Sequence, residues 1–218
     1  MIKASWSVVL ASIVLALTGC CCVVCPVEGE VSQRLLNRIT LGPAQHETYR
    51  VDLDGIERAQ VDVQFGGGTL DVHPTGTALL DAEFTFNLDG LEPNVDYEVV
   101  DGHAKLVLQQ DLDNVVWQPS AEFRNEWRLQ FTDQIPLEMD FAVGASQGTI
   151  ELGGLRLSQL QLDCGAADLT VRFGAPNPES MASMAIRSGA ARLELVGLGN
   201  TAAQDLVFDG GLGSYTFD

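Results

Sequence analysis

Four of the five cysteines lie within six positions near the start of the chain, where thiols could bind a metal, form a disulfide or carry a lipid. Residues 17–20 read Leu-Thr-Gly-Cys, the pattern of a bacterial lipobox, in which a peptidase cuts before a cysteine bearing diacylglycerol. Cys21, Cys22 and Cys25 lack the leucine three positions earlier and the small residue directly before them. The sequence therefore predicts lipidation at Cys20.

Other uses of these thiols are less well supported by their spacing. Cys22 and Cys25 have the CxxC spacing of zinc ligands, but a structural zinc site needs a second ligand pair on an ordered framework. The remaining cysteine, Cys164, is expected to be a small buried residue. A disulfide between Cys25 and either Cys21 or Cys22 is an alternative if the chain lies in an oxidising compartment. We predict no metal and no cofactor.

The segment before the lipobox reads as a leader. A lysine at position 3 precedes an uncharged, apolar stretch over residues 4–18. This stretch is shorter than the roughly 20 residues of a membrane helix and fits the core of a signal peptide. We expect residues 1–19 to be a lipoprotein signal peptide, with an uncleaved membrane anchor as the alternative. Both place the rest of the chain in the bacterial cell envelope, outside the cytoplasmic membrane, in a leaflet that the sequence does not specify.

A search for catalytic residues finds one motif. Residues 144–148 read Gly-Ala-Ser-Gln-Gly, which matches the nucleophile elbow of serine hydrolases and would make Ser146 the nucleophile. The elbow must lead from a strand into a helix, whereas the following residues favour a strand. The isolated residues His46, His73 and His103 form no metal-binding pair. We predict that the protein is not an enzyme and keep an envelope hydrolase as a weaker alternative.

Two further groups could bind ligands. Residues 66–72 resemble one calcium-binding nonapeptide, and the acidic pairs within residues 52–54 and 111–113 could hold Ca²⁺ weakly, although such acids on strands are usually solvated. Trp117 and Trp127, with Phe123 and Phe131 nearby, could form a platform for carbohydrate. We favour the other interpretation, in which these rings cover the end of a stack of repeats.

Charge narrows the choice of partners. The 218 residues carry 30 acidic and 12 basic side chains, a formal net charge of −18 at pH 7. Such a chain repels nucleic acid, so we exclude a nucleic-acid partner. The acids are mostly single and interleaved with apolar residues, which indicates solvated faces of ordered strands.

Apolar and polar residues alternate from about residue 47 onward, as expected for half-buried strands punctuated by Gly, Asp and Pro. We divide the chain into a lipidated N-terminus and tether over residues 20–45, an N-terminal β portion over 46–131, and C-terminal repeat coils over 132–218. No stretch after residue 40 has helical spacing over three turns.

The C-terminal half contains an internal repeat. A pattern of apolar-x-apolar-x-x-Gly-x-x-x-apolar-x-apolar recurs four times, and one further copy lies in the first half. Repeats of this size indicate stacked units that bury one another's apolar faces. The glycines that mark the register are expected to form corners with positive φ or close approach between coils: Gly66, Gly144, Gly165, Gly189 and Gly211.

This register predicts an all-β fold of stacked β coils, similar to a single-stranded right-handed β-helix, after an N-terminal β portion. A plain antiparallel β-sandwich is the alternative. Gly148 stands where the other copies have a larger apolar residue, so its coil is expected to be underpacked or bent. The residues predicted to face inward are Phe65, Val143, Leu162, Leu169, Val171, Ile186, Leu193, Leu195, Phe208, Tyr215 and Phe217.

Several of these segments resemble a known family. Residues 125–129 and 135–139, followed by the glycine-alanine repeats, look like the toast-rack domain of bacterial envelope proteins, which is related to LiaF-like cell-wall-stress proteins and to adhesin domains. Residues 82–87, 92–95 and 105–110 resemble the N-terminal part of the same family. The corners read GAS and GAA where the family usually has GAG. The resemblance covers about residues 45–218, implies an envelope scaffold or interaction domain, and supplies no catalytic residues.

Three hypotheses follow. The first is a non-catalytic envelope lipoprotein, adhesin-like or associated with envelope stress, that binds a protein or a cell-wall polymer. The second is a self-assembling structural module that forms a homo-oligomer through an open C-terminal coil, and the third is the envelope hydrolase. In each, the N-terminal lipid at Cys20 provides the contact with the membrane.

Overall fold

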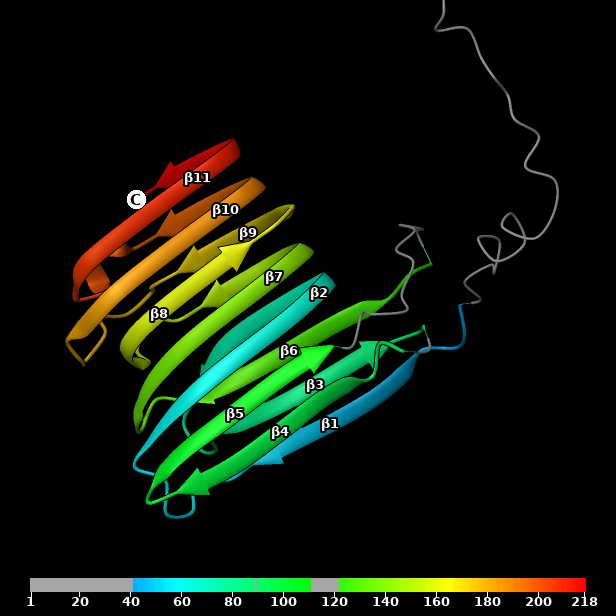
Figure 1. The fold of residues 1–218 in the computed structure, drawn as a ribbon, viewed down its shortest axis with the longest axis horizontal. Coiled ribbons are helices and arrows are strands. Elements are labelled where there is room, and N and C mark those ends of the chain that lie inside the picture. The colour runs from blue at the N-terminus through cyan, green and yellow to red at the C-terminus, as the bar shows by residue number, and fades with distance from the viewer. Residues whose placement is uncertain (1–40, 89, 111–121) are drawn as a thin grey trace, which may run out of the picture. The chain divides into compact units, whose positions relative to one another are not determined.

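The computed structural model describes residues 41–88, 90–110 and 122–218 (Figure 1). The predicted leader, the predicted lipidation site at Cys20, the other clustered cysteines, Trp117 and the acidic segment from residue 111 lie outside these described residues. The described part falls within one unit, Ile39–Asp218.

The described residues form an all-β structure in a single 11-stranded sheet, which confirms the all-β part of the predicted fold class. One 3-10 turn, Leu198–Asn200, is the only helical element in the described ranges, where no helix is long and apolar enough to cross a membrane. The strands are β1 (Gln45–Val51), β2 (Arg58–Thr75), β3 (Leu80–Phe86), β4 (Pro93–Val100), β5 (His103–Gln110), β6 (Asn125–Thr132), β7 (Pro136–Glu151), β8 (Arg156–Cys164), β9 (Ala167–Arg172), β10 (Met181–Val196) and β11 (Ala203–Phe217).

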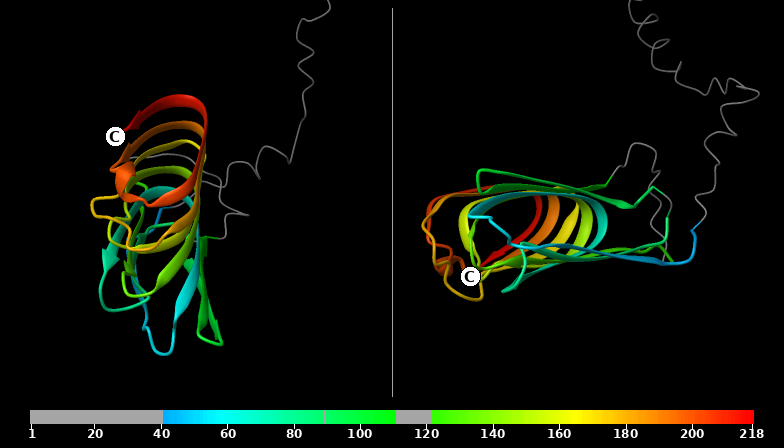
Figure 2. Two further views of the ribbon diagram at one scale, coloured as in Figure 1. Left: turned by 90° about the vertical axis from the view of Figure 1, so that its left-hand side faces the viewer. Right: turned by 90° about the horizontal axis from the view of Figure 1, so that it is seen from below.

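Four long strands organise the sheet. β2, β7, β10 and β11 bend near their middles, so that the two halves of each strand face one another across a shared interior (Figures 1 and 2). The first halves of β2, β7 and β10 pair in parallel with β5 or β8, and their second halves pair with β6 or β9. Among the described strands, β11 pairs with β10 alone. The result is a small core enclosed by parallel strands, with the further strands β1, β3 and β4 attached through antiparallel ladders.

The parallel ladders rule out the antiparallel sandwich for this part of the chain. β2 pairs in parallel with β7 from Ala59↔Leu137 to Val72↔Ile150, and β10 pairs in parallel with β11 from Met181↔Ala203 to Leu195↔Phe217. An antiparallel sandwich would need hairpins between these strands. The repeats pair with one another instead, as the glycine register indicates.

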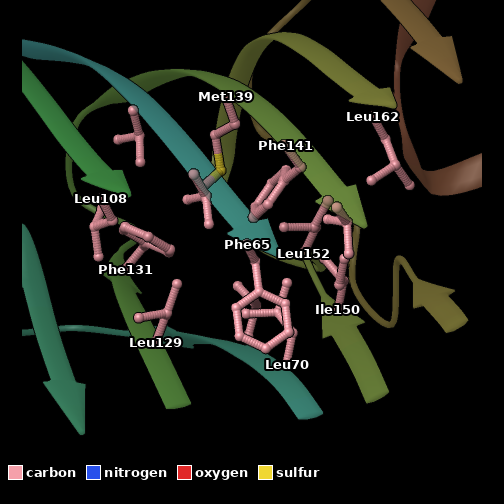
Figure 3. Packing of buried hydrophobic residues seen from close by; sticks show 14 of the residues in the cluster. Phe65, Leu70, Leu108, Leu129, Phe131, Met139, Phe141, Ile150, Leu152 and Leu162 are labelled. Carbon is pink, nitrogen blue, oxygen red and sulfur yellow. The ribbon is translucent and has the colours of Figure 1, made fainter. Parts of the chain in front are cut away.

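Alternating side chains build the core. Strand β3 shows the pattern directly, since its residues alternate between buried and more exposed positions along LDAEFTF. Side chains from both halves of the long strands meet inside, where Phe65, Leu70, Phe141 and Ile150 belong to one apolar cluster (Figure 3). Each has at most 1% of its surface exposed.

Most of the predicted inward positions are buried, but the last strand departs from the prediction. Phe208 and Tyr215 are only partly buried, and the prediction for Phe217 is wrong because half of its surface, 50%, is exposed. The physical reason is the position of β11, which pairs with β10 on one side and with no other described strand.

The five register glycines lie in one column, four of them on the long strands and Gly165 between β8 and β9. A Cβ atom on Gly144 would overlap the carbonyl oxygen of Gly66, and one on Gly211 would overlap that of Gly189. None of the five has a positive φ, so that half of the expectation is wrong. Close approach between neighbouring strands is what Gly144 and Gly211 require.

Gly148 has a different role from the column. Its φ of 145° lies in a region that L side chains rarely adopt, and a Cβ atom there would overlap the carbonyl oxygen of Leu70. It pairs with Leu70 on one side and Leu169 on the other. A glycine is therefore needed to let β7 pass between its neighbours.

Buried amides satisfy backbone groups where the strands bend. Asn125 donates a hydrogen bond to the carbonyl of Gly67, and the Gln110 side chain accepts one from the amide of Gly66 at 3.2 Å. Gln110 also donates to Asn125 Oδ1 at 3.0 Å. At the other end of the strands, Asn177 donates to the carbonyls of Leu157 and Thr201. These side chains supply partners that irregular backbone would otherwise lack.

Candidate functional site

A groove of about 1040 Å³ runs beside the glycine column. Its floor includes Gly66, Gly144, Gly165, Gly189 and Gly211. Because glycine has no side chain, the surface is hollowed where the strands bend. The groove therefore follows from the same residues that let the strands approach closely.

One wall of the groove is a row of side chains in register across seven strands. Neighbouring strands place them opposite one another, roughly 4.8 Å apart along the row. Most of these residues are polar, so the row offers amide, carboxylate and guanidinium groups in a regular array. We call it the groove row: Asn94, Gln109, Gln64, Ala142, Asp163, Arg187 and Asp209.

An ion pair joins two neighbouring residues of the groove row, Asp163 and Arg187. Arg187 Nη1 lies 3.2 Å from Asp163 Oδ1, and about half of the arginine side chain is exposed. Gln161 donates to the other oxygen of Asp163 at 2.9 Å. Asp209, next along the row, is exposed and has no ion pair with a described residue. The wall thus offers donors and acceptors to a ligand without first having to be rearranged.

A second row beside the groove row contains two carboxylates directly opposite each other. Asp62 on β2 pairs with Asp140 on β7. Partial burial raises the pKa of Asp140, Asp62 and Asp163 raise it further, and Arg187 opposes them. Like charges opposite one another on a sheet are destabilising, so this face tolerates an electrostatic cost.

Cys164 lies under the groove and is inert at neutral pH. Burial, with a smaller contribution from the charge of Asp163, raises the pKa of its thiol to about 11. The Sγ atom lies 3.5 Å from the carbonyl oxygen of Arg187, to which it donates. The prediction of a small buried residue is confirmed, since 5% of Cys164 is exposed.

The serine motif has no elbow geometry. Residues 144–148 lie inside β7, which continues as a strand to Glu151, so no helix follows Ser146. Ser146 is 8% exposed, and its hydroxyl is buried without a hydrogen-bond partner among the described residues. A base that could activate this hydroxyl is not in contact with it.

The remaining candidates are dispersed. His46 contacts Thr85 Oγ1 at 3.0 Å, His103 contacts the carbonyl of Asp101 at 3.1 Å, and His73 lies exposed on β2. Asp52 receives a hydrogen bond from Arg50 at 2.9 Å. Within the three described ranges, no group of three or more His, Cys, Asp or Glu side chains is placed to hold a metal ion.

The aromatic residues of β6 belong to the interior. Trp127 is 1% exposed and packs between Phe65 and Phe84, with ring centroids 5.2 Å and 5.0 Å away. Phe131 is fully buried. Trp127 thus joins β6 and β3 to the first long strand and offers no surface for stacking carbohydrate.

Sequence reasoning identified the glycines of the groove but not its wall. The outward residues of the groove row change type from strand to strand, so they form no motif. Asn125 and Gln110 were also missed, because single amides give no periodic signal. The available signal was the register itself, which places the residue two positions before each glycine in one row.

Comparisons with known proteins agree with this architecture. A family model described as the N-terminal domain of toast_rack, DUF2154, matches residues 40–196. A search of the curated proteins finds no match.

Solved structures extend the comparison. A protein described as a "putative cell adhesion protein" from Clostridium sporogenes superposes with a TM-score of 0.71 at 17% identity, covering 80% of this chain and 98% of its own. At this identity the likeness shows the fold alone. A "putative adhesin" from Bacteroides fragilis matches at 11% identity over 80% of this chain and 97% of its own, but its TM-score of 0.27 carries no structural argument.

Proposed function

We propose that this chain, which belongs to the toast-rack family, is a non-catalytic interaction module of the bacterial cell envelope, adhesin-like or associated with envelope stress. In this proposal the groove binds an envelope protein or a cell-wall polymer. The description of the Clostridium sporogenes protein with the same fold supports the adhesin-like part of the proposal.

The observation that carries the proposal is the groove row. An extended ligand lying along the glycine column would meet a hydrogen-bonding side chain on nearly every strand, from Asn94 on β4 to Asp209 on β11. The low floor would admit a chain that bulky side chains would exclude. Stacked repeats commonly use such extended surfaces for binding.

The finer description of the fold belongs to the same proposal. We interpret each long strand and its central glycine as one coil of a right-handed, single-stranded β-helix, with β8 and β9 together forming one coil. The in-register parallel ladders and the glycine column support this interpretation. The groove would then be the corner line of the helix.

The proposal places the protein on a membrane through a lipid at Cys20. Acyl chains contribute about 0.8 kcal/mol per buried CH2, and two or three chains would anchor the protein stably. Replacing Cys20→Ala should move the protein from the membrane fraction to the soluble fraction, whereas Cys21→Ala should leave it in the membrane. Retention of the Cys20→Ala protein on the membrane would contradict the lipid anchor.

Binding by the groove can be tested on the detergent-solubilised full chain with two probes. Purified peptidoglycan tests the polymer by co-sedimentation, and immobilised envelope proteins test the protein partner. The Arg187→Ala and Asp209→Ala double variant should weaken binding to one probe by about tenfold, equivalent to about 1.4 kcal/mol. Glu194→Ala, an exposed change on the other half of β10, should leave binding unchanged. Binding to neither probe, or equal binding by both variants, would overturn the proposal.

A further inference from the structure

Strand β11 leaves one end of the apolar core uncovered. Leu206, Val207, Leu212 and Phe217 are 47%, 56%, 84% and 50% exposed, and all four lie on this strand. They make up half of the large hydrophobic residues that are exposed in the described part of the chain. An apolar surface concentrated in this way on one strand indicates a contact surface.

Leu206 and Phe217, together with the partly buried Phe208 and Tyr215, continue rows that are buried one strand earlier. Met184 and Ile186 on β10 pair with Leu206 and Phe208. On the second half of β10, Leu193 and Leu195 pair with Tyr215 and Phe217. The four β10 residues are at most 1% exposed because β11 covers them. The four on β11 present the same pattern outward and need an equivalent cover.

The exposed end is already ordered as an aromatic cluster. The ring of Phe208 lies 5.0 Å from that of Tyr215 and 4.9 Å from that of Phe217, both edge to face. Tyr215 is held further by a 2.8 Å hydrogen bond between its hydroxyl and that of Ser188. A partner would therefore meet a preformed apolar surface, which lowers the entropy cost of docking.

The backbone of β11 is also available on its outer side. Among the described strands it pairs only with β10, so the outward N–H and C=O groups of residues 203–217 have no ladder partner. A strand edge of this length is a template for pairing with another chain. The partner must therefore bring an extended segment as well as apolar side chains.

We propose that β11 is the interface of a two-fold symmetric dimer, in which β11 of a second copy runs antiparallel along it. A two-fold axis between Gly211 and Leu212 brings Leu206 opposite Phe217 of the partner subunit and Phe208 opposite Tyr215 of the partner subunit. The strand is self-complementary because two inward apolar residues, spaced by two, lie on each side of its bend. A two-fold dimer is a closed assembly that adds no further copies, as are most soluble homo-oligomers.

Closure favours the second copy in this orientation over a head-to-tail stack, because a two-fold dimer is complete whereas a head-to-tail stack leaves a free end for the next copy. In the two-fold register, Asp209 faces Ser214 of the partner subunit, and Val207 faces Thr216 of the partner subunit. A head-to-tail stack would instead set β11 against the opposite edge, where β4 carries Asp96 and Glu98. Charge does not separate the two arrangements, because Asp205 would face Glu98 in the stack, continued in the register of the ladders, and faces Asp218 of the partner subunit in the dimer.

The dimer goes beyond the proposed ligand binding and does not depend on it. A dimer would carry two groove rows and two N-terminal segments. The two groove rows could bind one polymer, and the two N-terminal segments could insert in one membrane. In each case the second contact becomes intramolecular.

The test is the mass of the detergent-solubilised full chain, measured by light scattering over a wide range of concentration. The natural protein should form a dimer. The Leu206→Lys and Phe217→Lys double variant should dissociate at least about a hundredfold more readily. Both residues are about half exposed, so the variant should keep its β circular dichroism and its melting transition.

The matched control is the Val99→Lys and Val100→Lys double variant, which changes exposed valines on β4. It should dimerise like the natural protein. A natural protein that stays monomeric at every concentration overturns the proposal, as does a dimer that survives the β11 changes. Open-ended growth that the β4 control abolishes also overturns it, because that result would assign β11 to a head-to-tail stack.

Discussion

Gly144 approaches Gly66 so closely that a Cβ atom on Gly144 would overlap the carbonyl oxygen of Gly66. The two residues lie opposite each other within the β2–β7 ladder, at the bend of both strands. An added Cβ atom would come closer to a neighbouring atom at Gly144 than at Gly165, Gly189 or Gly211. This close approach explains why a side chain is excluded from that part of the groove floor.

The column predicts a graded response to alanine. Gly144→Ala forces backbone apart and should lower the free energy of unfolding by about 1–3 kcal/mol, the cost of overpacking. At Gly165 the added Cβ atom would lie 3.4 Å from the nearest atom, an ordinary contact, so Gly165→Ala should cost less than about 0.5 kcal/mol. Urea unfolding of the two variants measures the difference. Equal losses would show that the column is not set by close approach.

Partial burial of Asp140 and the facing carboxylate of Asp62 together predict a pH-dependent gain in stability when Asp140 is neutralised. Folding raises the pKa of Asp140 above its ordinary 3.8, so the folded state binds more protons, and stability falls as pH rises through the window above that value. The destabilisation caused by the charged Asp140 carboxylate is fully present at neutral pH. Asp140→Asn should therefore raise the free energy of unfolding there by about 0.2–1 kcal/mol and change it little near pH 3.

Thermal melting at the two pH values measures this effect. Glu138→Gln is the matched control, because Glu138 on the same strand lies opposite Gln60 and Gln159 and has no facing acid. It should give no comparable gain at neutral pH. Destabilisation by Asp140→Asn at neutral pH, or the same gain under acid conditions, would contradict the electrostatic cause.

Cys164 should resist alkylation in the folded protein. With its pKa raised to about 11, the thiolate fraction near pH 8 falls by about a hundredfold relative to an ordinary thiol. Iodoacetamide labelling followed by peptide mapping separates Cys164 from the four N-terminal cysteines. Labelling should become rapid only in denaturant. Equally fast labelling in the folded state would show that the thiol is accessible and ionised.

Asn125 should contribute strongly to stability. It is 2% exposed and holds the carbonyl of Gly67 and the side chain of Gln110. Asn125→Ala leaves these groups unpaired, with an expected loss of about 1–3 kcal/mol. Asn94→Ala, whose exposed side chain bonds only to Asp96 among described groups, should cost far less in the same denaturant titration. A neutral Asn125→Ala would mean that water or another group replaces the amide.

The sequence contained enough information for the stacking of the strands. Alternating residues and a glycine that recurs every 21 to 24 positions place Leu162, Ile186 and their counterparts in one buried row, because each copy needs its neighbours to cover its apolar side. The same logic fails at Phe217. A repeat pattern assumes a neighbour on both sides, and β11 has one only.

The candidate site was less predictable for a physical reason. Burial imposes a common side-chain type on the inward row, whereas the outward positions that become Gln64, Asp163 and Arg187 are under no such constraint. Their proximity depends on the ladder register across strands distant in sequence. The leader and Cys20, by contrast, can be predicted from local sequence alone, and they remain predictions.

The most direct test of the central claim is photo-cross-linking in cells with a light-activated amino acid in the groove. Placed at Gln64 or Arg187, the probe should give discrete adducts with an envelope protein or cell-wall polymer. Placed at Glu194, which is also exposed on β10 but outside the groove, it should give none. Adducts of equal yield from all three positions, or none from Gln64 and Arg187, would contradict ligand binding by the groove.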